Sequence, residues 1–139
     1  MMIRFKMFKI SVEQFAMLEE PSFKEEVDIN TSLGFDFDLD ERNIRIRMGF
    51  KFTQFEKMIM LLNTACEFNI HKDDWGEIKN DCKFVYPKYL IDCLLTQVVG
   101  TARGILHCKT EGTPYNPIII PPINVSQMLE HDIIIEKNN

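Results

Sequence analysis

Three histidines and four cysteines are the side chains of this sequence best suited to metal binding or nucleophilic chemistry. His107 and Cys108 are adjacent, and Cys93 and Cys82 precede them in the chain. Structural zinc sites use two closely spaced ligand pairs such as C-x2-C, and no such pair occurs here. Cysteine among apolar residues behaves as a small hydrophobe, which is the simpler interpretation of Cys93 and Cys108. We therefore expect no metal site.

A thiol or carboxylate enzyme is the alternative chemistry. None of His71, His107 and His131 lies in a recognised catalytic motif. The acid pair at residues 73–74 sits in a polar stretch, where solvation is the ordinary explanation. The six glycines form no loop of the kind that cradles phosphate. We therefore expect no catalytic residues, no cofactor and no enzymatic activity.

Composition and charge narrow the class of protein. A length of 139 residues fits a single domain spanning 1–139. A net charge of −5 argues against nucleic acid as a partner. The first ten residues, MMIRFKMFKI, are too interrupted by cations for a signal peptide, and the apolar runs are too short for membrane insertion. We expect a cytoplasmic protein whose thiols are reduced.

A hairpin is the best-defined local feature. The segments FDFDL at 35–39 and IRIRMGFKF at 44–52 both alternate between apolar and polar residues, and turn formers separate them. A symmetrical closure aligns the apolar pairs Leu39–Ile44, Phe37–Ile46 and Phe35–Met48. The same register predicts two ion pairs on the opposite face, Asp38–Arg45 and Asp36–Arg47.

A second hairpin is expected after a turn at 53–57, in which Phe55 is an exposed contact candidate. Its outgoing strand is apolar on both faces over part of its length, with Met58, Met60, Leu62, Cys66, Phe68 and Ile70 on one face and Ile59, Leu61 and Ala65 on the other. A strand of this kind is normally covered on both sides, and we expect another subunit to supply the second cover. Earlier strands are expected at 11–18 and 27–33, with a bulge at Gly34.

The second half of the chain reads as helix and extended segments. After a polar loop that Trp75 is expected to clamp onto the core, Pro87 is well placed to open a long helix. The apolar face of this helix is broad, with Leu90, Ile91, Leu94, Leu95, Val98, Val99, Ala102, Ile105 and Leu106. Gly100 and Gly104 allow another backbone to come close. An extended segment at 118–124 and a short helix to Leu129 follow, and the polar tail is expected to fray at its tip.

These elements, four strands followed by a long helix, an extended segment and a short helix, predict an antiparallel α+β domain. The segment 84–129, FVYPKYLIDCLLTQVVGTARGILHCKTEGTPYNPIIIPPINVSQML, resembles the C-terminal half of the SecB-like export chaperones. This resemblance implies a four-stranded antiparallel sheet with a long and a short helix on one face. The matching motifs are Tyr86-Pro87 at the helix opening, Arg103-Gly104 late in the helix, and Pro121-Pro122-Ile123-Asn124 before the second helix. The strand half matches in pattern only.

The resemblance implies an ATP-independent holdase that binds unfolded or partly folded polypeptides and assembles as a homotetramer, a dimer of dimers. It implies SecA as a candidate partner in protein export, contacted through an acidic outer sheet face. It also implies an apolar polypeptide-binding groove formed by Tyr115, Ile118, Ile120, Met128 and Leu129, although the same residues would equally suit the protein's own core. Only about ten residues follow Leu129, so the family's polar tail is short here.

Two further hypotheses stay open. One is an interaction module of the same fold that recognises a single partner, such as a chaperone for a toxin–antitoxin pair. The other is an enzyme, which the motifs do not support. Residues 19–41 hold nine acids against Lys24 alone, but the ion pairs predicted above would neutralise part of that face.

Overall fold

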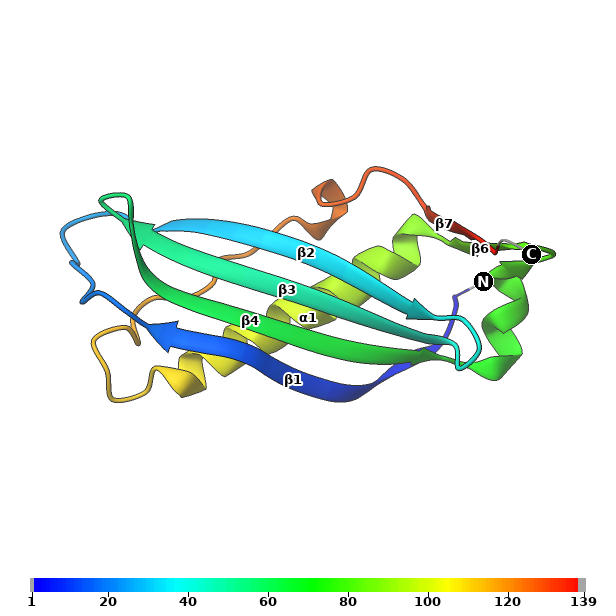
Figure 1. The fold of residues 1–139 in the computed structure, drawn as a ribbon, viewed down its shortest axis with the longest axis horizontal. Coiled ribbons are helices and arrows are strands. Elements are labelled where there is room, and N and C mark those ends of the chain that lie inside the picture. The colour runs from blue at the N-terminus through cyan, green and yellow to red at the C-terminus, as the bar shows by residue number, and fades with distance from the viewer. Residues whose placement is uncertain (1, 138–139) are drawn as a thin grey trace.

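The alternating segments of the first half form one antiparallel sheet, whose order is β1-β4-β3-β2. The structure, a computed structural model, describes residues 2–137. The sheet strands are β1 (Phe5–Met17), β2 (Asp28–Asp38), β3 (Asn43–Gln54) and β4 (Lys57–Ile70). Helix α1 (Lys88–Lys109) crosses one face of this sheet, so the α+β class predicted from the pattern is confirmed (Figure 1).

The register of the first hairpin differs from the predicted one by two residues. Phe37 lies opposite Ile44, and Phe35 lies opposite Ile46. A shift of two preserves which residues share a face, so the sorting of apolar and charged side chains is as predicted. The turn starts one residue earlier because the Asp38 carboxylate accepts a hydrogen bond from Glu41 N at 3.1 Å.

Between β2 and β3, the ion pair on the outer face joins residues that are diagonal to each other, because Asp36 lies directly opposite Arg45 and not Arg47. Arg47 Nε lies 3.2 Å from the carboxylate of Asp36, which confirms that predicted pair. The predicted pair of Asp38 with Arg45 is wrong. Arg45 instead reaches across the sheet to Glu13 on β1 at 3.1 Å and to Glu67 on β4 at 3.9 Å.

Gly34 does not mark a bulge, because the pairing of β2 with β3 is unbroken along its length. A Cβ atom at Gly34 would lie 2.9 Å from Nη2 of Arg47. The glycine therefore leaves space for the Arg47 side chain to lie over β2. The next turn contains only Phe55 and Glu56, both at positive φ (53° and 62°), as two-residue hairpin turns require.

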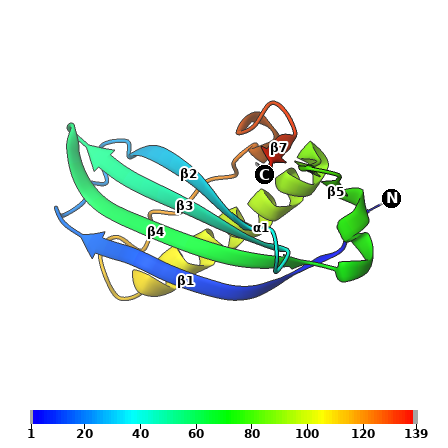
Figure 2. The same ribbon diagram turned by 45° about the vertical axis from the view of Figure 1, so that its right-hand side comes forward.

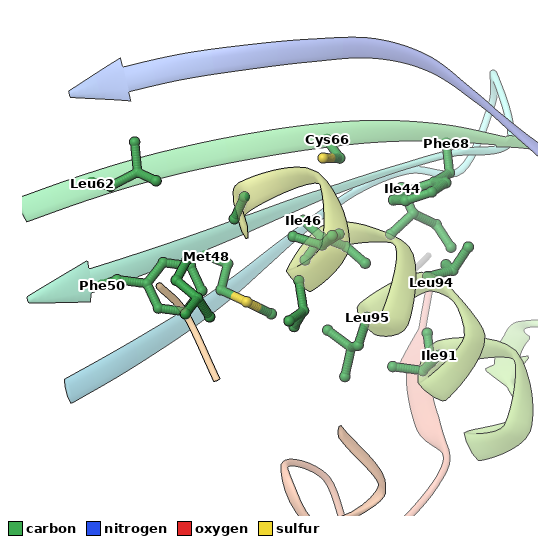
Figure 3. Close-up of a cluster of buried hydrophobic side chains, with 14 of the residues drawn as sticks. Ile44, Ile46, Met48, Phe50, Leu62, Cys66, Phe68, Ile91, Leu94 and Leu95 are labelled. Atoms are coloured by element: carbon green, nitrogen blue, oxygen red, sulfur yellow. The ribbon is translucent and has the colours of Figure 1, made fainter. Parts of the chain in front are cut away.

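The core lies between the sheet and α1 (Figure 3). Pro87 stands at the N-cap position of the helix, as predicted. The side chains that meet in this layer are fully or almost fully buried: Ile44, Ile46, Met48 and Phe50 of β3, Leu62, Cys66 and Phe68 of β4, and Ile91, Leu94 and Leu95 of α1. By length and composition alone α1 would also suffice to cross a membrane, a property that it shares with core helices.

The opposite face of β4 needs no second subunit for most of its apolar residues. Ile59 and Ala65 are buried within the protomer, and Leu61 is half-buried. The reason is the sheet order, because β4 is flanked by β1 and β3 and the side chains of both neighbours shelter it. Ile59 and Ala65 therefore need no cover from another subunit, and the expected contact of this strand with a second subunit stays a prediction.

A second, three-stranded sheet was not predicted. It comprises β5 (Lys79–Asn80), β6 (Lys83–Tyr86) and β7 (Ile133–Glu136), in that order, and lies beside the first turns of α1 (Figure 2). The tail thus forms a strand up to Glu136, and its tip at 138–139, where fraying was expected, lies outside the described residues. Asp132, just before β7, accepts a hydrogen bond from Lys88 N at 2.7 Å and so caps α1.

The polar loop after β4 and the predicted short second helix both form 3₁₀-helix, of two turns and one turn respectively. The first, η1 (Lys72–Glu77), holds Trp75 against Phe84 at 5.7 Å between ring centroids, which confirms the predicted clamp. The second, η2 (Val125–Gln127), is shorter than predicted and is capped by Asn124, which accepts from Ser126 N.

Asp74 is buried and not solvated as expected, and its ion pair with the exposed side chain of Arg4 ties the residue before β1 to η1. Asp74 accepts hydrogen bonds from Arg4 N at 2.8 Å, Nε at 2.9 Å and Nη2 at 3.1 Å. The hydrogen bonds and positive charge of Arg4 lower the pKa of the Asp74 carboxyl from 3.8 to about 2. Because the folded pKa lies below the unfolded one, this ion pair stabilises the fold above about pH 4.

We predict that protonation of Asp74 destabilises the fold as the pH falls from about 4 to about 2. Asp74→Asn should lower the melting temperature at neutral pH and remove that part of the acid dependence. Thermal unfolding followed by circular dichroism across this pH range measures both effects. Asp73→Asn, whose side chain is largely exposed, is the control and should change little. Parallel pH curves for wild type and Asp74→Asn would contradict the assignment.

Candidate functional site

The segment that links α1 to η2 is held in place by one arginine. Arg103 Nε donates to the carbonyl of Ile120 at 2.6 Å, and Nη2 donates to the carbonyl of Pro121 at 2.9 Å. The fork of donors on a guanidinium suits two neighbouring carbonyl groups, which an ammonium on lysine would not bridge. At the start of the segment, Tyr115 donates a hydrogen bond from its hydroxyl to Glu19 O at 2.5 Å.

The five residues predicted to form a polypeptide-binding groove belong to this segment and to η2. Tyr115, Ile118 and Ile120 are buried in the core of the protomer, with exposed fractions of 7, 8 and 1%. Met128 and Leu129 are half-buried and pack against the same core. Their part in binding a polypeptide stays a prediction, and in this protomer the first three offer almost no surface.

The residue between the two buried isoleucines is the exposed one. Ile119 has 58% of its surface exposed, because successive residues of an extended segment point to opposite sides. The sequence predicts that alternate residues of this extended segment point to opposite sides, but it does not show whether Ile119 or its two neighbours face inward. The sequence prediction missed Ile119 for this reason.

Two apolar hollows run along the outer side of α1 and share Gly100 and Gly104. The first, of about 560 Å³, lies toward β1 and is lined by Val12, Gly100, Thr101, Gly104, Ile105, Cys108 and Lys109. The second, of about 390 Å³, lies toward the linking segment and is lined by Gly100, Arg103, Gly104, His107, Ile118 and Ile119. We call these two hollows together the α1 groove.

The glycines open this groove. A Cβ atom added at Gly100 or Gly104 would have no neighbouring atom within 4 Å. The protomer therefore has no internal need for glycine at either position, although glycine weakens a helix by about 0.5–1 kcal/mol relative to alanine. Their absent side chains leave helix backbone open to contact from outside.

The edge strand β1 extends the apolar surface beside the groove. Ile10 and Val12 pair with Cys66 and Thr64, so they lie on the face of the sheet that carries the core. They are nevertheless 52% and 38% exposed. The core face thus continues past the helix onto β1 without a cover in the protomer.

The candidate nucleophiles and metal ligands do not assemble into a site. Within residues 2–137, no group of three or more histidine, cysteine, aspartate or glutamate side chains converges. Burial raises the pKa of the Cys66 thiol to about 11, which keeps it protonated and unreactive. Cys82, Cys93 and Cys108 are free and exposed. The α1 groove, in contrast, offers apolar contact surface.

The sheet, its covering helix and the anchored linking segment define the fold of the SecB-like chaperones. The structure of the Mycobacterium tuberculosis SecB-like chaperone Rv1957, in complex with a ChAD peptide from the antitoxin HigA1 (Rv1956), superposes with a TM-score of 0.56. The two chains are 12% identical, and the match covers 86% of this chain and 91% of that one. At such low identity the likeness shows the fold alone.

Other comparisons add little. A protein of unknown function from Streptococcus agalactiae matches with a TM-score of 0.38 and 10% identity, over 80% of this chain and 90% of that chain. No family model matches the sequence, and no curated protein matches it.

We predict that Arg103→Gln releases the linking segment from α1. The loss of two charge-assisted hydrogen bonds should cost about 1–3 kcal/mol of stability. Amide hydrogen exchange at residues 118–120 should accelerate at least tenfold, as mass spectrometry would measure. Lys51→Gln, which removes an exposed cation on β3, is the matched control. Unchanged exchange in Arg103→Gln would show that packing alone holds the segment.

Proposed function

We propose that this chain is an ATP-independent chaperone that holds extended apolar segments of non-native polypeptides in the cytoplasm. The observation that carries the proposal is the α1 groove, an apolar surface with an exposed isoleucine and two glycines that the protomer itself does not fill. The SecB-like fold supports it, since a protein of that fold has been solved with a peptide bound. Capture of an unfolded chain needs buried apolar area and no catalytic group.

We further propose that part of the same surface joins protomers into a dimer of dimers. The glycine pair permits a second helix backbone to approach α1 closely. Ile10 and Val12 would add apolar area at the side of this contact. Oligomerisation and polypeptide binding would then divide the α1 groove and the β1 surface between them.

Recognition of a single partner is the second candidate function. The peptide in the similar solved structure comes from one antitoxin, which favours a specific interaction for a protein of this fold. Such a module would need the same apolar surface, but it would bind fewer polypeptide sequences. The two functions differ in how many unrelated polypeptides are held.

An export role with SecA as partner has weaker support. The acidic outer sheet face implied by the resemblance is partly neutralised here, because Arg45 pairs with Glu13 and Glu67. Lys9 also approaches Glu67 at 3.9 Å, and Arg47 pairs with Asp36. We therefore place holding ahead of export in this proposal.

We predict that leucine at both glycines preserves the protomer and disrupts assembly. Gly100→Leu with Gly104→Leu should leave the fold intact and its melting temperature equal or higher, because no atom lies near either added Cβ. The solution mass from light scattering should fall from tetramer toward dimer or monomer. Gly76→Leu, where the added Cβ also meets no atom, is the control. A tetramer that survives the double substitution would contradict the interface.

We predict that Ile119→Asp weakens suppression of client aggregation at least several-fold. Light scattering of three unrelated denatured proteins, with and without the chain, measures the effect. Phe55→Asp is the matched control, since Phe55 is 68% exposed but lies in the distant β3–β4 turn. Equal loss in both variants would show that any exposed apolar residue suffices. Suppression for none of the three clients would favour the single-partner function.

A further inference from the structure

The cations at one end of the sheet are concentrated far beyond what the net charge of −5 leads one to expect. A pocket of about 290 Å³ is lined by Arg4, Phe5, Lys6, Arg42, Asn69, His71 and Lys72. These residues come from the chain around the start of β1, from the β2–β3 turn, and from the end of β4 and the start of η1, which meet at the same end of the sheet (Figure 1). We call this cavity the cationic pocket.

Most of this positive charge is not neutralised by the protein. Arg4 is paired with Asp74 at 2.9 Å and approaches Asp73 at 4.0 Å. In contrast, Lys6, Arg42 and Lys72 form no ion pair within residues 2–137. Among the described residues, these four cationic side chains therefore form ion pairs with two carboxylates only, and both pairs are made by Arg4. Like charges gathered without partners cost free energy unless an anion completes the site.

The local backbone fixes Arg42 toward this pocket. Arg42 has a left-handed conformation, with φ at 59°, which is uncommon for a residue with a side chain. Its Nε donates to the carbonyl of Ile70 at 3.3 Å, which leaves the two terminal nitrogens available to a ligand. Asn69 holds the turn in place by donating from Nδ2 to Glu41 O at 2.9 Å and to Asn43 Oδ1 at 2.7 Å.

His71 adds a ring nitrogen to the wall of the pocket. Its Nδ1 accepts a hydrogen bond from Asp73 N at 3.1 Å, so the proton of a neutral ring lies on Nε2. The pocket thus combines a guanidinium fork, two ammonium groups and an imidazole. This set of donors suits an anion with several oxygens.

We propose that the cationic pocket binds a phosphate-type oxyanion. A cavity of about 290 Å³ is at the lower end of the range for ligand pockets, which suits a compact dianion better than a length of acidic polypeptide. Lys6, Arg42 and Lys72 supply the charge, and His71 supplies a further hydrogen bond. The site is independent of the α1 groove, so its failure would leave the proposed chaperone function untouched.

Titration of the full chain with inorganic phosphate tests the proposal. Isothermal calorimetry at constant ionic strength, with chloride as the balancing anion, should show saturable binding. Lys6→Gln with Lys72→Gln should weaken the affinity at least tenfold. Both lysines are exposed, so the fold should persist, and circular dichroism verifies it. Lys51→Gln with Lys79→Gln removes the same charge from exposed positions elsewhere and should bind as wild type does.

A second titration with methyl phosphate distinguishes a site for free phosphate from a site for a phosphorylated compound. Binding of the ester as tightly as the free ion supports a site for a phosphorylated compound, and loss of binding supports one for free phosphate. Equal affinity of the two double variants would overturn the proposal, because the effect would then follow net charge alone. A glutamate-rich peptide that binds through Lys6 and Lys72 while phosphate does not would overturn it as well.

Discussion

The rest of the structure depends on one mismatch of widths, because the apolar face of the sheet is wider than the single helix that covers it. Four strands about 4.8 Å apart span roughly 14 Å between the outer two, whereas a helix with its side chains is about 10–12 Å across. Helix α1 lies over the central strands β3 and β4. The uncovered remainder falls on β1, where Ile10 and Val12 continue the core face into solvent. An exposed apolar margin is thus a consequence of the architecture.

The linking segment covers part of the apolar sheet face that α1 leaves open, and the rest of that face stays exposed. Ile118 and Ile120 turn inward and Arg103 fixes the carbonyls beside them, so this segment serves as additional cover for the core. The alternation of an extended backbone then obliges Ile119 to face outward. Gly100 and Gly104 have no side chains, so the helix backbone is open to contact beside Ile119. Burial inside the protomer and apolar surface outside it therefore arise from the same linking segment and the same two turns of helix.

Sequence patterns predicted the features that follow from local periodicity. They failed where contacts between distant residues or the backbone conformation of a turn decide the structure. The faces of β2 and β3 were predictable from alternation, but registers two residues apart satisfy the same alternation equally well. The choice between them rests on the Asp38 side chain and the left-handed Arg42 in the turn. The second sheet was missed because β6 and β7 have four residues each and lie far apart in the chain. Ile119 was missed because nothing in the local sequence of an extended apolar segment shows which of its two sides is buried.

An apolar edge strand invites strand addition, and β1 carries features that oppose it. The pairing of β1 with β4 is irregular between Met7 and Lys9 and again between Val12 and Gln14. Bulges and charged residues are the usual means by which proteins disfavour pairing at a sheet edge. Exposed pairs such as Lys9 with Glu67 contribute at most about 1 kcal/mol to stability, so their main effect is to fix the outward face of the strand. The surface that β1 leaves open is therefore its apolar side chains and not its backbone, and these side chains border the α1 groove.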